Sequence, residues 1–367
     1  MRTKTILWTA AAAVVVLLLA GAGITFALRS GDDEDTASTA PSAVASVPLA
    51  PSPSATPSPS PGSDITGPLD LLLLGVDTRV SVADWQPHSD SIMLLHVDAG
   101  LKTAYLTSLP RDLRVDIPAF AKNGYPGGRH KLTEAMAYGA RVKGTDKANV
   151  PQGYELLAKT ISAYTGIKKF DAGAVLTFGG LAKLTDALGG VTLTIDQKVV
   201  SHHRKPDGSM RPLKAGGGDY VGPQAVYLPG TRTLVGWQAI DYARQRYGLP
   251  NGDYDRTRHQ RQLVRALLTK AESSGLATDS SKLQAVITAL GDSLLLTGSR
   301  SAVEYAYALR DLTPASIKLV DLPGDSVSSG GGYVGEQLSA EGRAYLKAVA
   351  AGKPAAFLAG HPKLINK

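Results

Sequence analysis

The 367-residue chain contains no cysteine, so no disulfide can form and its stability must come from packing. No internal repeat is evident, and no Gly-x-Ser-x-Gly pattern marks a nucleophile elbow. The glycine runs at 216–218 and 330–332 lack the flanking strand and helix of a phosphate-binding loop, so they are predicted to be flexible loops. These absences leave no sequence signature of a disulfide scaffold, a repeat protein or a nucleotide-binding loop.

Residues 1–28 predict a short cytoplasmic tip followed by a transmembrane anchor. Arg2 and Lys4 precede an uncharged run at 5–28, which is long enough to cross a bilayer core of roughly 30 Å. Positive charges before the run predict a cytoplasmic N-terminus and an extracytoplasmic remainder, hence a single-pass protein of the cell membrane. A cleaved signal peptide is the alternative, because residues 20–23 (AGAG) resemble a cleavage site.

Residues 29–66 are acidic at first and then dense in Ser, Pro, Ala and Thr. This composition buries too little apolar surface to fold, so it predicts a disordered linker that lifts a folded domain off the membrane. The net charge of +7 fits acidic partners such as nucleic acid, anionic lipid or phosphorylated glycan. Extracytoplasmic placement excludes nucleic acid as the expected partner.

The remaining residues predict one α/β domain, with a mixed central β-sheet sandwiched by helices. Apolar and alternating patterns predict strands near 69–76, 91–97, 103–109, 172–178, 191–199 and 317–322. Helical spacing marks 132–141, 154–164, 181–188, 234–243, 256–270, 283–290, 302–312 and 340–350. We expect the domain at 67–325 and a C-terminal extension at 326–367, packed on the same domain.

The segment 241–261 carries five arginines interleaved with Tyr, Asp and Gln rather than in one block. Helical spacing puts Arg256 and Gln260 on the face of the core leucines, near the helix start, and puts Arg258 and Arg265 on the opposite face, in water. An inward arginine at a helix N-terminus is typical of an anion site, although a surface helix with salt bridges is the alternative. Arg244 and Arg246 fall where helix gives way to extended chain, so they project to one side.

Two carboxylates, Asp77 and Asp90, flank the neighbouring first and second strands. Mg²⁺ binds one or two carboxylates together with phosphate oxygens, so these residues predict a metal site, with Mn²⁺ as a substitute. The alternative is that both are turn or cap residues. Arg111, at the end of the next strand, is placed to reach the same edge.

At this point the chain resembles the LytR-CpsA-Psr family of bacterial cell-envelope proteins. The resemblance covers about 200 residues, in the family's order and spacing. It rests on residues 71–79 (LLLLGVDTR), 89–91 (SDS), 108–112 (SLPRD), 131 with 137–139 (K and AYG), 186–191 (DALGGV), 234–246 (LVGWQAIDYARQR) and 252–261 (GDYDRTRHQR).

The resemblance implies a phosphotransferase that moves a glycopolymer from a polyprenyl-diphosphate carrier onto peptidoglycan, forming a phosphodiester. It implies that the pyrophosphate is bound by Arg111, Arg244, Arg246, Arg256 and Gln260. It also implies that Asp77 and Asp90 hold Mg²⁺, with Arg79 and Lys131 nearby, and that an apolar tunnel between sheet and helices holds the prenyl tail. A non-catalytic surface protein that binds polyprenyl phosphate lipid or anionic glycan is the alternative function.

Two residues depart from the family pattern. His88 stands where the family has arginine, which removes one expected basic contact. Asp255 stands where a small residue precedes the helix arginine, so it is expected either to cap the helix or to alter the charge preference of the site.

Overall fold

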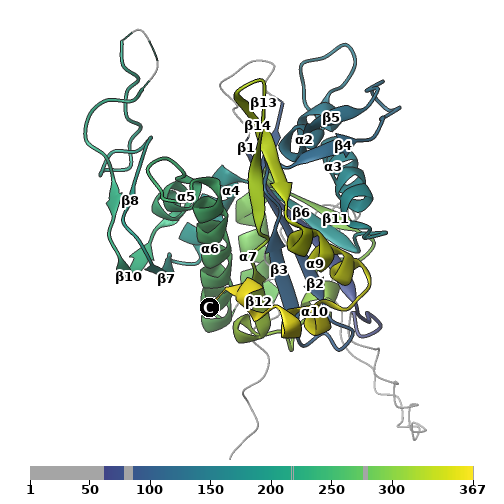
Figure 1. The fold of residues 1–367 in the computed structure, drawn as a ribbon. Coiled ribbons are helices and arrows are strands. Elements are labelled where there is room, and N and C mark those ends of the chain that lie inside the picture. Colours follow the sequence, from purple (N-terminus) through teal and green to yellow (C-terminus); the bar gives the residue numbers. More distant parts are fainter. Residues whose placement is uncertain (1–61, 78–85, 216, 218, 276–279, 367) are drawn as a thin grey trace, which may run out of the picture.

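A mixed β-sheet forms the centre of the molecule (Figure 1). The computed structural model describes residues 62–77, 86–215, 217, 219–275 and 280–366. The strands of the sheet are β1 (Leu69–Asp77), β2 (His88–Val97), β3 (Ala104–Ser108), β6 (Ala172–Thr177), β11 (Leu294–Gly298), β12 (Ile317–Val320) and β15 (Ile365–Asn366). Their order is β11-β6-β1-β2-β3-β12-β15. Because β1 is parallel to β6 and β3 to β12, while β2 is antiparallel to both β1 and β3, the predicted mixed sheet is confirmed.

The almost wholly apolar β1 explains why helices cover both faces of the sheet. Its side chains alternate, so that Leu71 and Leu73 enter one hydrophobic core and Leu72 and Leu74 enter the other. A strand segment buried on both faces needs an apolar residue at every position, which Leu71 to Leu74 supply.

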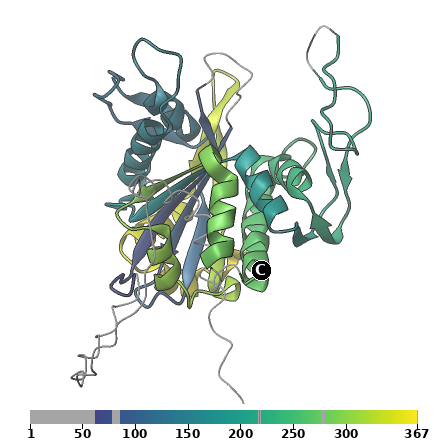
Figure 2. The ribbon, with the colours of Figure 1, turned by 180° about the vertical axis from the view of Figure 1, so that it is seen from behind.

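Helices on one face of the sheet are α4 (Phe178–Ala187), α5 (Gly236–Arg244), α6 (Asp253–Ser273), α7 (Ser280–Leu290) and α8 (Ala302–Ala308). The other face is covered by α2 (Leu132–Ala140), α3 (Val150–Thr165), α9 (Ala340–Ala350) and α10 (Pro354–Gly360). Short 3₁₀ turns occupy Gly291–Ser293, Pro314–Ser316 and Pro362–Leu364. Figures 1 and 2 show the two layers from opposite sides, so the predicted sandwich is confirmed.

Smaller pairs of antiparallel strands lie outside the central sheet. The strands β4 (Arg114–Ile117) and β5 (Gly128–Lys131) form one pair beside α2. An arm next to α5 and α6 consists of β7 (Val191–Ile195) with β10 (Gly230–Leu234) and β8 (Val199–Val200) with β9 (Val226–Tyr227) (Figure 1). The strand predicted at 191–199 is therefore split between β7 and β8.

The glycine run at 330–332 was predicted to be a flexible loop, and the structure places Gly330 and Gly331 in the turn of a hairpin, with Gly332 at the start of a strand. The strands β13 (Gly324–Ser329) and β14 (Gly332–Leu338) pair, with Ser329 opposite Gly332. The residues between them, Gly330 and Gly331, have φ of 59° and 81°. A two-residue hairpin turn of this kind needs positive φ at both positions, which glycine adopts without strain.

The N-terminal predictions fall mostly outside the described residues. The expected anchor at 1–28 and the linker up to residue 61 are not among them. In the described part of the chain, no helix is long and apolar enough to cross a membrane. Residues 62–66, which the sequence assigns to the linker, pack on the domain instead: Ile65 contacts the core and Asp64 forms an ion pair with Arg300. The folded part thus begins slightly earlier than predicted.

Deletion of residues 1–60 should leave a soluble, folded domain, because the apolar run lies before the first residues that pack on the core. We expect a monodisperse product with a cooperative thermal transition in circular dichroism. A deletion of residues 1–67 is the informative comparison, since it also removes Ile65 and the ion pair of Asp64 and should melt at a lower temperature. An insoluble 1–60 deletion, alongside folded full-length protein in detergent, would contradict the anchor-and-linker interpretation.

Candidate active site

Asp90 is presented by a β-bulge at the end of the β1–β2 pair. Gly75 lies opposite Ser91 and Val76 lies opposite Ser89, so Asp90 is the extra residue between them. A bulge of this type re-aims a side chain and often lies beside a functional site. The Asp90 side chain is 14% exposed and forms an ion pair with Arg111, from the turn after β3. The geometry therefore brings together an aspartate and an arginine that the sequence predicted at the same edge.

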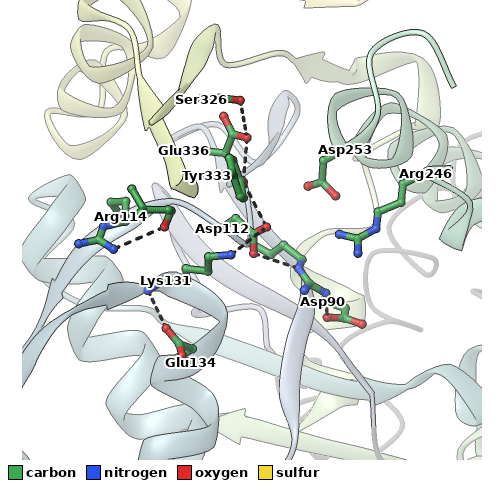
Figure 3. Close-up of polar contacts among 12 residues, drawn as sticks. Asp90, Asp112, Arg114, Lys131, Glu134, Arg246, Asp253, Ser326, Tyr333 and Glu336 are labelled. Atoms are coloured by element: carbon green, nitrogen blue, oxygen red, sulfur yellow. Dashed lines mark hydrogen bonds and ion pairs between the residues drawn. The ribbon is translucent and has the colours of Figure 1, made fainter. Parts of the chain in front are cut away.

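Asp112 joins this pair to Lys131 (Figure 3). Its carboxylate accepts from the Arg111 Nε at 3.3 Å and lies 3.6 Å from the Lys131 Nζ. Burial would raise the pKa of Asp112, but Arg111 and Lys131 outweigh it and hold that pKa below its usual range. Burial likewise opposes the charge of Arg111, yet Asp90 and Asp112 raise its pKa overall.

Arg256 occupies the first turn of α6 and is 5% exposed. Its Nη2 lies 2.5 Å from the Asp253 carboxylate, and its Nε makes no hydrogen bond to a described residue. Burial lowers the pKa of Arg256, with Asp253 opposing, and both Arg111 and Asp90 lie close enough to interact with it electrostatically. A buried guanidinium with spare donors is costly unless an anion completes its contacts.

The C-terminal hairpin contributes two residues that the sequence did not single out. The Tyr333 hydroxyl donates to Asp112 at 3.2 Å and to Glu336 at 2.9 Å, and Lys131 lies 4.9 Å above the Tyr333 ring. Glu336 also accepts from Ser326 (Figure 3). It accepts from Tyr254 of α6 as well, so it links the hairpin to that helix. No local motif signals these contacts, because they depend on how the distant hairpin packs against β4.

Arg244, Arg246 and Gln260 approach the cluster from α5 and α6. Arg246 and Asp253 lie together on that side of the cluster, facing Asp90 (Figure 3). The guanidinium of Arg244 stacks 4.3 Å over the Phe178 ring. Gln260 is 7% exposed, and its Oε1 has no hydrogen-bond partner among the described residues.

An apolar cavity lies directly below these groups, between β1, β2 and β6 on one side and α4, α5 and α6 on the other. It has a free volume of about 70 Å³ and is lined by Leu73, Met93, Leu176, Phe178, Leu181, Ile240, Arg244, Gln260, Leu263 and Val264, among others. Its polar lining residues are Ser91, Arg244 and Gln260, and the other lining residues are glycine or apolar. It lies between sheet and helices, where the family resemblance implied an apolar tunnel.

The inward face of α6 is as predicted, but its opposite face is not in water. Arg258 forms ion pairs with Asp255 and with Asp196, at 2.5 and 2.9 Å. Arg265 is partly buried and donates to the Ile317 carbonyl at 3.0 Å. The prediction of exposed arginines was wrong because Asp196, at the base of the arm, and the start of β12 cover that flank of the helix.

Arg261, which the sequence did not select, is among the most deeply buried side chains, at 2% exposure. It forms an ion pair with Asp321, after β12. Burial, with Arg258 as a secondary cause, lowers the pKa of Arg261 to about 9, which leaves it charged at neutral pH. A period-3.6 pattern does not mark it as buried, because it lies three residues after Arg258 and four before Arg265, on the face that the sequence predicted to be in water.

The structure thus gathers most of the predicted site residues at one edge of the sheet. Asp90, Arg111, Arg246 and Arg256 form the centre, Lys131 joins through Asp112, and Gln260 and Arg244 border the apolar cavity. Asp77 ends β1 opposite His88, but its side chain lies outside the description, as does all of Arg79.

Comparison with known proteins decides the family. The family model described as LytR_cpsA_psr matches residues 34–346, most of the chain. The chain belongs to the LytR_cpsA_psr family. The resemblance noted from the motifs is thereby confirmed.

Relatives of this LytR_cpsA_psr protein are similar over much of its length. Biofilm regulatory protein A of Streptococcus mutans is 29% identical over 72% of this chain and 59% of its own. The cell wall biosynthesis protein LcpA of Corynebacterium glutamicum is 26% identical over 74% of this chain and 53% of its own. A polyisoprenyl-teichoic acid–peptidoglycan teichoic acid transferase, TagU of Enterococcus faecalis, is 29% identical over 62% of this chain and 60% of its own. The chain therefore spans a little over half the length of these relatives.

Solved structures share the fold. A protein of Streptococcus agalactiae superposes with a TM-score of 0.60 at 25% identity, covering 78% of this chain and 87% of its own. TagT bound to LI-WTA superposes with a TM-score of 0.54 at 23% identity, covering 78% of this chain and 90% of its own. These likenesses agree with the mixed sheet between helical layers.

Two departures from the LytR_cpsA_psr pattern have local explanations. The Nδ1 of His88 lies 2.9 Å from the Gln86 carbonyl, so that nitrogen is engaged locally. Asp255 accepts from the backbone and side-chain nitrogens of Asn251, at 3.0 and 3.3 Å, and closes the turn before α6. Asp255 therefore has the capping role that was one of its two expected alternatives.

The residues of the site could bind a hard cation only if a substrate supplied some of its oxygen ligands. Among the described side chains, no group of three or more acidic or histidine residues is arranged to hold a metal. Asp90 supplies one carboxylate, and Mg²⁺ commonly takes one or two protein carboxylates, with phosphate oxygens and water completing its shell. The donor set is compatible with Mg²⁺ held jointly by the protein and a phosphorylated ligand.

Asp112→Asn should weaken the LytR_cpsA_psr domain by about 1–3 kcal/mol at neutral pH, because Arg111 and Lys131 lose a buried carboxylate. The native pKa of Asp112 is lowered, so its stabilising contribution exists above about pH 4 and disappears as the pH falls through the native pKa. Urea unfolding should show that the free energy of unfolding is lower for the variant than for wild type at pH 7, and that this difference becomes smaller at acidic pH. Asp292→Asn, at an exposed position, should have the same free energy of unfolding as wild type at both pH values.

Proposed function

We propose that this protein is a membrane-anchored, extracytoplasmic phosphotransferase that moves a glycopolymer from a polyprenyl-diphosphate carrier onto peptidoglycan. The observation that carries the proposal is the buried Arg256, which has unused donors, beside Arg111 and Asp90 and above an apolar cavity. This arrangement suits an amphipathic ligand with a diphosphate at one end and a hydrocarbon chain at the other. The TagU relative is named as a transferase that joins teichoic acid to peptidoglycan, and LcpA is named for cell wall biosynthesis.

The arginines would bind the diphosphate. Guanidinium groups remain charged at any working pH and match phosphate oxygens with paired hydrogen bonds. Arg111 and Arg256 would contact it from the sheet edge and the helix start, and Arg244 and Arg246 from the end of α5. The Gln260 amide would add an uncharged donor beside the apolar cavity. Positive charge arranged before the reaction stabilises the charge that develops on the transferring phosphate.

The prenyl tail would enter the apolar cavity below the diphosphate. Its described volume of about 70 Å³ holds only part of a long tail, so Leu181, Ile240 and Val264 would have to move apart. Movement of α4 and α5 away from the sheet would widen it without disturbing the arginine cluster. The lipid is thereby expected to select an opened form of the cavity.

In the reaction, a hydroxyl of the acceptor glycan attacks the phosphorus bonded to the donor sugar. A new oxygen–phosphorus bond forms, the bond to the second phosphate breaks, and polyprenyl phosphate leaves with the electron pair. Asp90, with Asp77, would hold Mg²⁺ or Mn²⁺ against the phosphates. Such a cation neutralises charge on the transferring and leaving groups.

We further propose that residues 1–28 anchor the protein in the cell membrane, with the N-terminus in the cytoplasm. This placement would bring the apolar cavity to the lipid carrier and the arginine cluster to the wall. Protease treatment of intact cells should remove the folded domain. Protection from the protease would contradict the proposed orientation.

The transfer reaction separates the enzyme from a lipid-binding protein. Purified protein would be incubated with a polyprenyl-diphosphate-linked glycan, insoluble peptidoglycan and Mg²⁺. The proposal predicts glycan that stays on the peptidoglycan after hot detergent washing, with polyprenyl phosphate released in equal amount. Lipid binding without covalent product would favour the non-catalytic alternative.

A further inference from the structure

A cavity of about 290 Å³ lies on the flank of α6 that faces β3 and β12. We call it the mixed-charge cavity. It is distinct from the apolar cavity, which lies on the β1–β6 flank of the same helix. Its walls include Ser108, Pro110, Tyr254, Arg261, Leu322 and Glu336. The arginine cluster at the start of α6 therefore has a cavity on either side, and the proposed donor occupies only one of them.

The lining of the mixed-charge cavity suits a polyhydroxylated ligand. Carboxylates come from Asp253, Asp255, Asp321 and Glu336, and cations from Arg258, Arg261 and Lys363. Proline and leucine side chains form apolar patches between them. Carboxylates disfavour a diphosphate, but the mixture of acceptors and donors matches the hydroxyl and acyl groups of a sugar. Small-molecule sites commonly combine an apolar lining with a few placed polar groups in this way.

Arg261 is the strongest sign that a ligand belongs in this cavity. Its side chain is 2% exposed and lines the cavity. Its Nη2 forms the ion pair with Asp321, whereas its Nε makes no hydrogen bond to a described residue. A buried guanidinium with unused donors costs stability unless a carbonyl or hydroxyl oxygen accepts from it.

Asp253 connects the mixed-charge cavity to the arginine cluster. It lines the cavity, and its Oδ1 lies 2.5 Å from the Arg256 Nη2. Apart from this ion pair, Oδ1 has no hydrogen-bond partner among the described residues. A hydroxyl bound in the cavity near Asp253 would thus lie next to the group proposed to hold the diphosphate.

We propose that the mixed-charge cavity binds a sugar unit of the acceptor glycan and that Asp253 accepts the proton of its attacking hydroxyl. The inference rests on the proposed function. The proton moves from the hydroxyl to the Asp253 carboxylate as the oxygen bonds to phosphorus, and the bond to the leaving polyprenyl phosphate breaks. Protonated Asp253 then returns the proton to water. Donor and acceptor would thus reach the phosphate from opposite flanks of α6.

Binding of a soluble acceptor fragment tests the cavity without any turnover. The probe is the N-acetylglucosamine–N-acetylmuramic acid disaccharide, and ligand-observed NMR gives its Kd. Arg261→Met keeps the side-chain length but removes the donors, and should raise the Kd at least tenfold. Arg265→Met makes the same change one turn further along α6, outside the cavity, and should stay within twofold of wild type. Equal Kd values for wild type and Arg261→Met, or no measurable binding to wild type, would overturn the proposal.

A second variant keeps the test decisive if Arg261→Met does not fold. Thr257 lines the cavity from a partly exposed helix position, so Thr257→Trp should fill the space and abolish disaccharide binding. Displacement of the disaccharide by inorganic pyrophosphate alone would instead indicate an anion site and would contradict the assignment.

The role of Asp253 is tested by separating catalysis from binding. Asp253→Asn should lower kcat for transfer about a hundredfold or more, while the disaccharide Kd and the binding of a short prenyl diphosphate change less than threefold. Weakened prenyl diphosphate binding would mean that Asp253 only positions Arg256. If wild type binds the disaccharide but transfers nothing, the proposed function fails and the cavity stands. If wild type transfers glycan with an acceptor KM unaffected by Arg261→Met, only the cavity proposal fails.

Discussion

Arg256→Ala should lower the rate of glycopolymer transfer about ten- to a hundredfold, because a charge-assisted contact from a buried arginine to phosphate contributes roughly 1.5–3 kcal/mol. The Arg256 side chain is 6% exposed and its Nε has no hydrogen-bond partner among the described residues, so under the proposed function a phosphate oxygen would accept from it. Transfer rates and prenyl diphosphate binding would be measured on the same preparation. Arg111→Ala, Arg244→Ala and Arg246→Ala should also lower the transfer rate and weaken prenyl diphosphate binding.

The matched control for Arg256 lies on the same helix. Lys270→Ala also removes one positive charge from α6, but near its C-terminal end and away from both cavities. It should transfer glycan at the wild-type rate. Arg256→Lys should recover little activity, since an ammonium group cannot form the paired contacts of a guanidinium. Equal losses in Arg256→Ala and Lys270→Ala would show that only the net charge of the helix matters.

Asp90→Asn should reduce transfer about a hundredfold or more, because loss of a cation ligand costs several kcal/mol of transition-state stabilisation. Asp77→Asn should have a similar effect, and the double variant should be little worse than either, since both would serve one cation. A chelator should abolish the wild-type reaction, and Mg²⁺ or Mn²⁺ should restore it. Full activity in the chelator would exclude the metal role.

Asp116→Asn is the control for this prediction. Asp116 is an aspartate of β4 whose side chain is 78% exposed and pairs with Arg129 at the surface. Its replacement should leave transfer unchanged. Binding of Mn²⁺ measured by calorimetry, with and without a short prenyl diphosphate, separates a lost metal ligand from a misplaced Arg111. Asp90→Asn should abolish the metal binding that the diphosphate promotes.

The sequence predicts well those features that depend on local periodicity. The apolar run of β1 identifies a strand buried on both faces, and the spacing of Arg256, Gln260 and Leu263 places them on the inward face of α6. Motif order supplies the family. These signals are local because side-chain direction repeats every 3.6 residues in a helix and every two in a strand.

Features that depend on distant packing could not be predicted in the same way. Periodicity indicates which side of α6 faces the sheet, but not that Asp196 and the start of β12 cover the other side. Tyr333 and Glu336 enter the site only because the β13–β14 hairpin folds back against β4. The bulge that presents Asp90 depends on the register between β1 and β2, which no residue of either strand reveals alone.

The path of one phosphorus atom tests the central claim most directly. A polyprenyl-diphosphate-linked glycan would be labelled with ³²P at the phosphate next to the sugar and incubated with the protein and peptidoglycan. A phosphotransferase predicts that the label moves to the washed peptidoglycan together with the glycan, one phosphorus for each chain transferred, and that Arg256→Ala slows its appearance. Label that stays with the lipid, whether or not the glycan moves, would contradict the account.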